Sequence, residues 1–432
     1  MKRFFLIFVL LLFSSAARAA DFYLKGADRV VFYGDSITAQ NLYTSFVESF
    51  VVTRFPALHV RFINSGWGGD RVSGGNGGTI EARLQRDVAA FKPTVVTVNL
   101  GLNDGGWRAF DQELYNKFAL GMENIVGLLR AQLPSARITL LTPTPFDDIT
   151  RPPRFEGGYN KVMQNYGAFV QDLAARQNLG IADVNTPVVA ALMEANRQDN
   201  ALAQKMMGDR AHAGEGGHLL FAAELLKAWN APPTATAVVI DVAPVNALDA
   251  TPQTKPKVFY AQNTKVTWLQ KEAGFAPTPG SFSWLQDDKA LPMPLDLKDA
   301  ALMLAVKSSD FLQQLDKQFL IVRNLPFARY QLKIDGRNIG IYTREEWESG
   351  VNLAALPTPM LEQAQKVHAL TLEHNRIHLL RWRQLQIPLA DQMTPAAVQA
   401  LAAVDALEDD LVARQNALAR PVPHQYELTP VT

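Results

Sequence analysis

The stretch RVVFYGDS at residues 29–36 is a short run of β-branched and aromatic residues that ends directly in Gly-Asp-Ser. Similar runs recur along the next 150 residues or so, and segments with helical spacing lie between them. The further runs cover residues 58–63, 94–100, 137–141 and 181–184, and the helical segments cover 115–133, 159–177 and 187–207. Strands that alternate with helices predict a mainly parallel sheet covered on both faces. Since ligands bind beyond the carboxyl ends of such strands, we expect the chemistry in the loops that follow them.

The pattern changes at APPTAT, residues 231–236, which indicates a linker or a domain edge. Short alternating runs follow, and Asp335-Gly336 is typical of a hairpin turn between two of them. Thr343 with Glu346 has the spacing of a capping box that opens a helix, and Thr394-Pro395 is typical of another helix start. The second half is therefore predicted to be a small β-rich unit followed by helices.

The first residues are typical of an export signal. Lys2 and Arg3 precede ten apolar residues at 4–13, and Ala17-Arg18-Ala19 is a small-x-small cleavage site. The apolar run is too short to span a bilayer comfortably, although an N-terminal membrane anchor is the alternative. We expect a secreted or periplasmic protein, cleaved near Ala19, without stable membrane insertion. The predicted parts are a signal peptide at 1–19, an α/β domain at 20–231, a β-rich domain at 232–342 and a helical region at 343–432.

Composition excludes several classes of function. Lys plus Arg and Asp plus Glu each number 42, so the formal net charge is zero and nucleic-acid binding driven by bulk positive charge is not expected. There is no Cys, which excludes disulfides, thiolate zinc sites, Cys nucleophiles and iron–sulfur clusters. A hydrophobic fraction of 48% is that of a folded protein. No cofactor-binding motif stands out, and no cofactor is expected.

A serine and an Asp-x-x-His sequence form one candidate site. Ser36 follows the first strand directly, where its hydroxyl would be exposed beside the N–H groups of a helix. Asp209, three residues before His212, can turn back and accept the Nδ1 proton, which leaves Nε2 free to take a proton from the serine. Gly-Asp-Ser is also an ordinary turn, and His212 can be a solvated turn residue, so neither signal is decisive alone.

Donors for an oxyanion are the third requirement of such a site. Asn103 follows the predicted strand at 94–100, so its amide would lie at the same sheet edge as Ser36. The second strand ends in NSGWGGD at residues 64–70, where the backbone N–H of a glycine can approach a ligand closely. Asn, Asp and Gly are also common in plain loops, which is the alternative for both segments.

The set of Ser, Gly, Asn and Asp-x-x-His, in that chain order, resembles the SGNH (GDSL-type) hydrolase family. The resemblance covers about residues 29–229, roughly half of the chain. It implies an α/β fold, a flavodoxin-like three-layer α/β/α sandwich with a mainly parallel sheet. It also implies a carboxylic ester hydrolase that works without a metal. The segment 330–383 looks like a C-terminal extension of some secreted bacterial relatives, for which the resemblance implies no role.

The resemblance assigns roles to five positions. Ser36 matches the nucleophile, Asp209 and His212 match the final block, and Gly69 and Asn103 join the Ser36 N–H in an oxyanion hole. Two details qualify the match. Gly66 and Gly68 are alternative glycines of the second block, and Ala213 stands where relatives often have Pro.

Other polar residues have rival interpretations. His218 is an alternative base that we interpret as a packing residue, and Asp35 is expected to hydrogen-bond the nucleophile loop. His374 and His378 lie four apart on a predicted helix, a spacing that can bind metal with a third ligand. We favour a docking face that also uses Trp382, because the His-Glu-x-x-His order is missing.

The predicted function is an exported serine esterase acting on short-chain esters, and acetyl esters are the expected substrates. A small-molecule or polysaccharide ester is the expected substrate, and Trp67 and Trp107 beside the catalytic loops are candidates for stacking on a sugar ring. The alternatives are a lysophospholipase or thioesterase with the same triad, or a non-catalytic glycan-binding protein. The sequence leaves the oligomeric state open.

Overall fold

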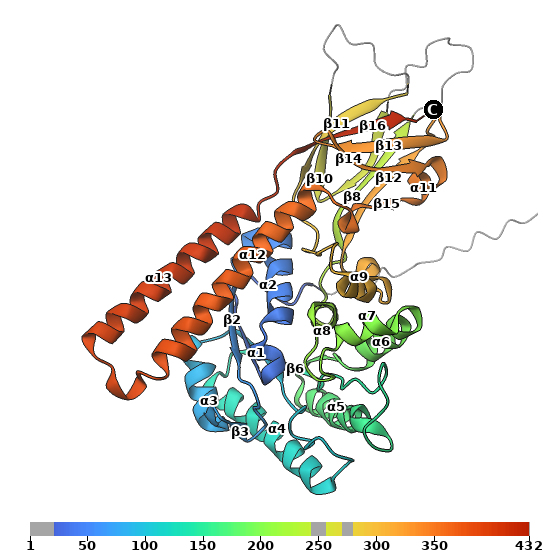
Figure 1. The fold of residues 1–432 in the computed structure, drawn as a ribbon. Helices are drawn as coiled ribbons and strands as arrows, with labels where there is room; N and C mark the ends of the chain where they lie inside the picture. Colours follow the sequence, from blue (N-terminus) through green and yellow to red (C-terminus); the bar gives the residue numbers. More distant parts are fainter. Residues whose placement is uncertain (1–20, 243–255, 270–279, 432) are drawn as a thin grey trace, which may run out of the picture.

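The computed structural model describes residues 21–242, 256–269 and 280–431 (Figure 1). The signal peptide predicted at residues 1–19 lies outside the described residues. Along the described chain, an α/β half comes first, a β-rich unit follows, and a long helical hairpin runs back beside the first half (Figure 1). In these parts no helix is long and apolar enough to cross a membrane.

The first half is built on a five-stranded sheet in the order β2-β1-β5-β6-β7. All neighbouring strands pair in parallel, and most of their residues are buried. The strands are β1 (Arg29–Gly34), β2 (Arg61–Gly66), β5 (Val95–Asn99), β6 (Arg137–Leu141) and β7 (Gly180–Ala182). Each matches a predicted strand to within a few residues, and the predicted α/β fold class is confirmed.

Helices connect these strands and flank the sheet. They are α1 (Ser36–Ala39), α2 (Leu42–Arg54), α3 (Ile80–Asp87), α4 (Gln112–Gln132), α5 (Gly158–Gln177), α6 (Thr186–Gln198), α7 (Asn200–Met206) and α8 (Glu215–Ala228). The prediction of one helix over 187–207 is wrong. The side chain of Asp199 accepts a hydrogen bond from the Leu202 N–H, so it ends α6 and caps the start of α7.

The second unit consists of two sheets that share one apolar cluster. One sheet has the order β10-β11-β16-β13-β14 and the other β15-β12-β8-β9. Trp284, Tyr330 and Tyr426 of the first sheet lie in the same cluster as Ile240 and Leu320 of the second. The strands are β8 (Thr234–Val242), β9 (Pro256–Gln262), β10 (Thr264–Trp268), β11 (Phe282–Asp288), β12 (Lys317–Arg323), β13 (Arg329–Ile334), β14 (Arg337–Thr343), β15 (Val351–Asn352) and β16 (His424–Pro430).

The predicted division into a β-rich region and a helical C-terminal region differs from the structure in one respect. Strand β16, near the end of the chain, lies between β11 and β13 in the middle of a sheet. Its alternate residues His424, Tyr426 and Leu428 are buried, which is the period of a strand with one face on a core. The last residues therefore complete the β-rich unit. The short helix α11 (Arg344–Ser349) packs on β12 of this unit, whereas α9 (Ala300–Lys307) and α10 (Phe311–Gln314) pack on α8 of the α/β half.

The helical hairpin consists of α12 (Pro359–Leu379) and α13 (Pro395–Leu418), with a π-helical segment, η4 (Leu380–Gln386), after α12. The predicted capping box at Thr343 and the helix start at Thr394 are both present. The hairpin packs on α2 through a buried polar cluster centred on Glu48. His374, Asn375 and Gln415 lie with their side-chain nitrogens within 3.2 Å of the Glu48 carboxylate. The hairpin is thereby joined to the α/β half.

Candidate active site

Ser36 is the first residue of α1, directly after β1. Asp35 caps this helix, because its buried carboxylate accepts a hydrogen bond of 2.9 Å from the Ile37 N–H. Burial raises the pKa of Asp35 to about 7, against the Ile37 hydrogen bond and with the help of Asp104 and Asp70. As the sequence analysis expected, Asp35 hydrogen-bonds the loop that carries the serine.

Ser36, His212 and Asp209 form a continuous hydrogen-bonded chain. The His212 Nδ1 lies 2.8 Å from Asp209 Oδ2, and Nε2 lies 2.9 Å from Ser36 Oγ. Because a carboxylate only accepts, Nδ1 carries the proton and the Ser36 hydroxyl donates to Nε2. The structure therefore brings together three residues that are up to 176 positions apart.

The loop that carries the histidine is held by Asp209 itself. Oδ1 of Asp209 accepts from the N–H groups of Ala211 at 3.0 Å and His212 at 2.8 Å. Partial burial works to raise the pKa of Asp209, but the hydrogen bonds from the His212 backbone and ring and from Ala211 prevail and lower it to about 2. This carboxylate is thus ionised under ordinary conditions and favours the tautomer just described.

Arg210, between these two residues, was missed by the sequence analysis. Its φ of +90° is in the left-handed region that non-glycine residues rarely adopt. Its N–H donates to the Met207 carbonyl at 2.7 Å, and its carbonyl accepts from the Asp147 N–H at 2.9 Å. The guanidinium also donates to the Pro152 carbonyl at 2.9 Å. These bonds hold the strained loop in place, and no local sequence pattern indicates them.

A tight turn at Trp67–Asp70 presents Gly69. The Asp70 N–H donates to the Trp67 carbonyl at 3.1 Å, and Gly69 has a φ of +80° at the third position, which favours glycine. Since the turn uses the N–H of Asp70, that of Gly69 is left for a ligand. The alternative Gly66 has a packing role, because a Cβ there would lie 2.2 Å from the Ala39 nitrogen.

The side-chain amide of Asn103 points toward the same loops. Its Nδ2 donates to the Asp70 carbonyl at 3.0 Å and lies 3.5 Å from Asp35 Oδ2. The amide therefore lies between the turn at residues 67–70 and the loop that carries Ser36. A donor at this place can reach an oxyanion that forms beside the serine.

Two hollows adjoin these donors. One of about 790 Å³ is bordered by Asn103, and one of about 570 Å³ is bordered by Gly69. Both are lined by Arg71, Ser73 and Thr79. The space beside the proposed donors is much larger than an acetyl group, and its shared wall is polar.

The two tryptophans singled out from the sequence have different surroundings. Trp107 is 40% exposed and stacks on Tyr159 with 5.2 Å between ring centroids, so it keeps surface for a ligand. The stacking prediction does not suit Trp67. Its ring is packed by the guanidinium of Arg383, 4.0 Å from the ring centroid, and by the edge of Trp382.

His218 is fully buried behind the site. The Tyr43 N–H donates to its Nδ1 at 3.3 Å, so Nε2 donates to Gln40 Oε1 at 3.2 Å. Gln40 in turn donates to the Ala213 carbonyl, next to His212. Burial, with the nearby His212, lowers the pKa of His218 to about 3. His218 is therefore a packing residue that orients Gln40, which agrees with the prediction from the sequence.

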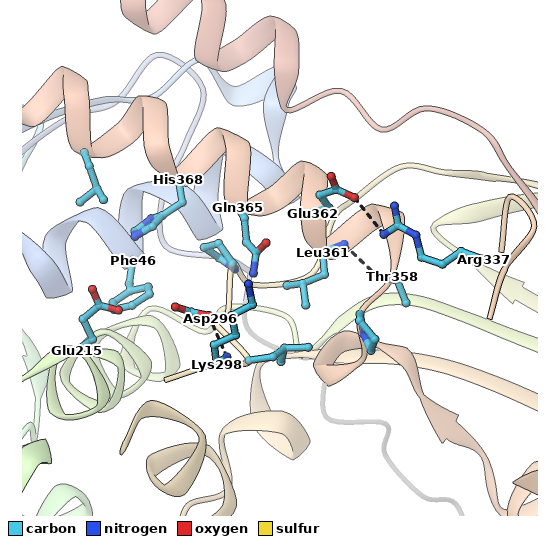
Figure 2. Close-up of a pocket in the computed structure, with 14 residues that line it drawn as sticks. Phe46, Glu215, Asp296, Lys298, Arg337, Thr358, Leu361, Glu362, Gln365 and His368 are labelled. Carbon is cyan, nitrogen blue, oxygen red and sulfur yellow. Dashed lines mark hydrogen bonds and ion pairs between the residues drawn. The ribbon is translucent and has the colours of Figure 1, made fainter. Parts of the chain in front are cut away.

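A further hollow of about 550 Å³ lies between the α/β half and the C-terminal hairpin (Figure 2). The side chains that Figure 2 labels come from α2, α8, the segment before α9, β14 and α12, and Ser36 and His212 do not line it. His368 there stacks on Phe46, and its Nδ1 lies 2.9 Å from Ser49 Oγ. Burial lowers the pKa of His368 to about 4, and Arg337 is paired with Glu362.

The histidines on the hairpin face other parts of the protein. His374 contacts Glu48 of α2, and the His378 ring meets Phe91 of the α/β half with 5.6 Å between the ring centroids. Within the residues that the structure describes, no group of three His, Cys, Asp or Glu side chains is placed to hold a metal ion. The surroundings of these histidines are those of a docking face.

Comparisons with known proteins support this description. Residues 32–220 match the family model described as the GDSL-like lipase/acylhydrolase family. An acetylxylan esterase from Geobacillus stearothermophilus is 24% identical over 224 residues, which are 47% of this chain and 94% of that protein. A solved structure of a gut microbial diltiazem-metabolizing enzyme is similar over 94% of this chain and 98% of that one, with a TM-score of 0.75 and 22% identity.

The structural likeness extends over both halves and shows that the fold as a whole is shared. The family match covers the strands, the serine loop and the loop of His212. Residues 32–220 of this chain are therefore a GDSL-like lipase/acylhydrolase domain, and the protein is an ester-bond hydrolase.

Proposed function

We propose that the protein is an exported serine esterase that hydrolyses short-chain, chiefly acetyl, esters on carbohydrate. The observation that carries the proposal is the chain of hydrogen bonds of 2.8 and 2.9 Å from Asp209 through His212 to Ser36. The likeness to an acetylxylan esterase supports the substrate class. Export is proposed from the signal-like residues 1–19.

The mechanism follows from the proton positions. Ser36 Oγ attacks the ester carbonyl while His212 Nε2 takes its proton. The imidazolium then protonates the leaving alcohol, and an acyl-enzyme on Ser36 remains. His212 then takes a proton from water as the water oxygen attacks the acyl-enzyme. The carboxylic acid leaves, and His212 returns the proton to Ser36 Oγ. Asp209 stabilises the imidazolium and does not itself take the proton.

The negative charge that develops on the carbonyl oxygen must be stabilised by hydrogen-bond donors. We assign the backbone N–H groups of Ser36 and Gly69 and the Nδ2 amide of Asn103. The Asn103 amide donates to the Asp70 carbonyl and lies 3.5 Å from Asp35 Oδ2, so it is already placed between the turn at residues 67–70 and the serine loop.

Asn103→Ala should lower kcat about 10²- to 10³-fold with little change in KM, because a donor to the transition state is lost. Steady-state hydrolysis of p-nitrophenyl acetate measures both constants. Asn116→Ala on the exposed face of α4 is the matched control, because its amide bonds only Gln112 on the same helix. An Asn103→Ala variant with the kcat of the wild type would remove this residue from the oxyanion hole.

Asp209→Asn should lower kcat about 10⁴-fold, since an amide does not fix the tautomer that leaves Nε2 free. The pKa of about 2 means that the folded protein favours the ionised carboxylate, which is lost only as the pH falls through that value. Asp209 should therefore stay ionised across the neutral range, and steady-state hydrolysis of p-nitrophenyl acetate there measures the loss in the variant. A kcat of Asp209→Asn equal to that of the wild type would remove Asp209 from the triad.

Arg71, Ser73 and Thr79, which line both hollows, can hydrogen-bond a hydroxyl-rich leaving group, and exposed Trp107 can stack on a sugar. The larger hollow also has apolar side chains, including Ile80 and Phe118, which can hold an acyl chain. A series of p-nitrophenyl esters from acetyl to long chains, with acetate release from acetylated polysaccharides, tests this assignment. Preference for acetyl esters supports it. Preference for long chains would instead favour a lysophospholipase-type substrate.

A further inference from the structure

We propose that the π-helical segment η4 of the C-terminal hairpin positions the oxyanion hole of the esterase. Arg383 and Trp382 would hold the turn at residues 67–70, which offers the N–H of Gly69 to the substrate. The inference rests on the proposed function of that turn. It gives the C-terminal hairpin a part in the reaction, although its residues do not touch the reacting atoms.

The first step is the contact between η4 and the turn. The guanidinium carbon of Arg383 lies 4.0 Å from the centroid of the Trp67 ring, a close cation–π contact. Trp382, 1% exposed, meets the same ring edge-on at a centroid distance of 5.8 Å. Two consecutive residues of η4 thus hold the side chain at the start of the turn, together with Arg83 and Arg86 of α3, which lie 5.2 and 5.6 Å from the ring centroid.

The second step is a buried ionic network that holds the other end of the turn. Arg83 of α3 donates from Nε to Asp70 Oδ2 at 2.7 Å and from Nη2 to the Ser65 carbonyl at 2.9 Å, and it also pairs with Asp87. Asp87 accepts at 2.7 Å from the indole N–H of Trp382. The side chains of Arg83, Asp70 and Asp87 are fully buried. Trp382 therefore donates a hydrogen bond to the network that holds Asp70.

The third step leads from the turn to the chemistry. The Trp67 N–H donates to the Gly34 carbonyl at 2.9 Å, two residues before Ser36. The Asp70 carbonyl accepts from Asn103 Nδ2 at 3.0 Å. A displacement of either end of the turn would thus move Gly69 and release Asn103.

The form of η4 fits this role. The π-helix is rare and, in single turns, is frequent at functional sites. Here it follows the long α12, and its residues Trp382 and Arg383 contact Asp87 of α3 and Trp67 of the turn. Because oxyanion donors act at defined distances, a shift of about 1 Å can cost on the order of 10²-fold in rate.

The test is Arg383→Met in the full chain, which removes the cation and keeps a chain of similar length. We expect kcat for p-nitrophenyl acetate to fall about 10- to 100-fold with KM unchanged. The affinity for a boronic acid that forms a tetrahedral adduct on Ser36 should fall by the same factor. Arg383→Lys should restore part of the activity, since an ammonium also interacts with the indole ring.

Arg61→Met is the matched control. It breaks the Arg61–Asp409 pair, another contact between the α/β half and the hairpin, but it does not reach the turn. Its kcat should equal that of the wild type. If Arg383→Met does not fold, Trp382→Phe keeps the packing and removes the hydrogen bond to Asp87, with the same expectation.

The outcomes separate the two proposals. A wild type that hydrolyses no ester would overturn the proposed function itself. An active wild type whose kcat and boronate affinity are unchanged in Arg383→Met, or fall equally in Arg61→Met, overturns the positioning role alone. A loss of kcat and of boronate affinity in Arg383→Met but not in Arg61→Met, with partial rescue by Arg383→Lys, supports the positioning role.

Discussion

Ser36→Ala should lower kcat for p-nitrophenyl acetate by about six orders of magnitude. The Ser36 hydroxyl is the group that donates to Nε2 of His212 at 2.9 Å, so its removal takes away the nucleophile and the bond through which it is activated. The remaining acceleration would come from the oxyanion donors and from substrate binding, which the change leaves in place.

This result is informative only if the variant folds. Ser36 lies at a helix start where Asp35, and not the serine, supplies the capping bond, so its circular dichroism and melting temperature should match the wild type. Ser349→Ala on α11, in the β-rich unit, is a control whose activity should not change. Activity of Ser36→Ala within about tenfold of the wild type would exclude a serine mechanism at this residue.

His212→Ala should cause a loss similar to that of Ser36→Ala, because the serine and its base act as one unit. The double variant Ser36→Ala with His212→Ala should be little worse than either single variant. Independent roles would instead give losses that multiply. Single-turnover and steady-state rates of the three variants measure the difference.

His218→Gln distinguishes the two histidines. His218 contacts Tyr43 and Gln40, and Gln40 reaches the Ala213 carbonyl, so its replacement should act on stability and on the placement of the His212 loop. We expect a far smaller loss of kcat than in His212→Ala. A larger loss in His218→Gln would make His218 the base.

The sheet and the loops of the candidate site could be predicted because they depend on local patterns. Buried parallel strands appear as short apolar runs, and their carboxyl ends meet at one edge. Ser36 and Asn103 each follow such a run directly, and Asp209 has the spacing to reach His212. The placement of these residues therefore follows from topology once the strands are recognised.

Other features depend on contacts that no local pattern contains. Trp67 was expected to face a sugar, but Arg383 and Trp382, more than 300 positions away in the sequence, pack on its ring. The buried network of Arg83, Asp70 and Asp87 likewise receives a hydrogen bond from the distant Trp382. By contrast, the break between α6 and α7 has a local signal in Asp199, which can cap a helix. The hydrophobic spacing over 187–207 continues across this residue and does not indicate the break.

The central claim is that the reaction passes through an acyl-enzyme on Ser36. Mass spectrometry of enzyme mixed rapidly with p-nitrophenyl acetate, quenched in acid and digested, measures this directly. We predict one acetyl group on the peptide that contains Ser36, at a level that follows the burst of nitrophenol and is absent from Ser36→Ala. Turnover at full rate with no acetylated peptide, or with the acetyl group on another residue, would contradict the account.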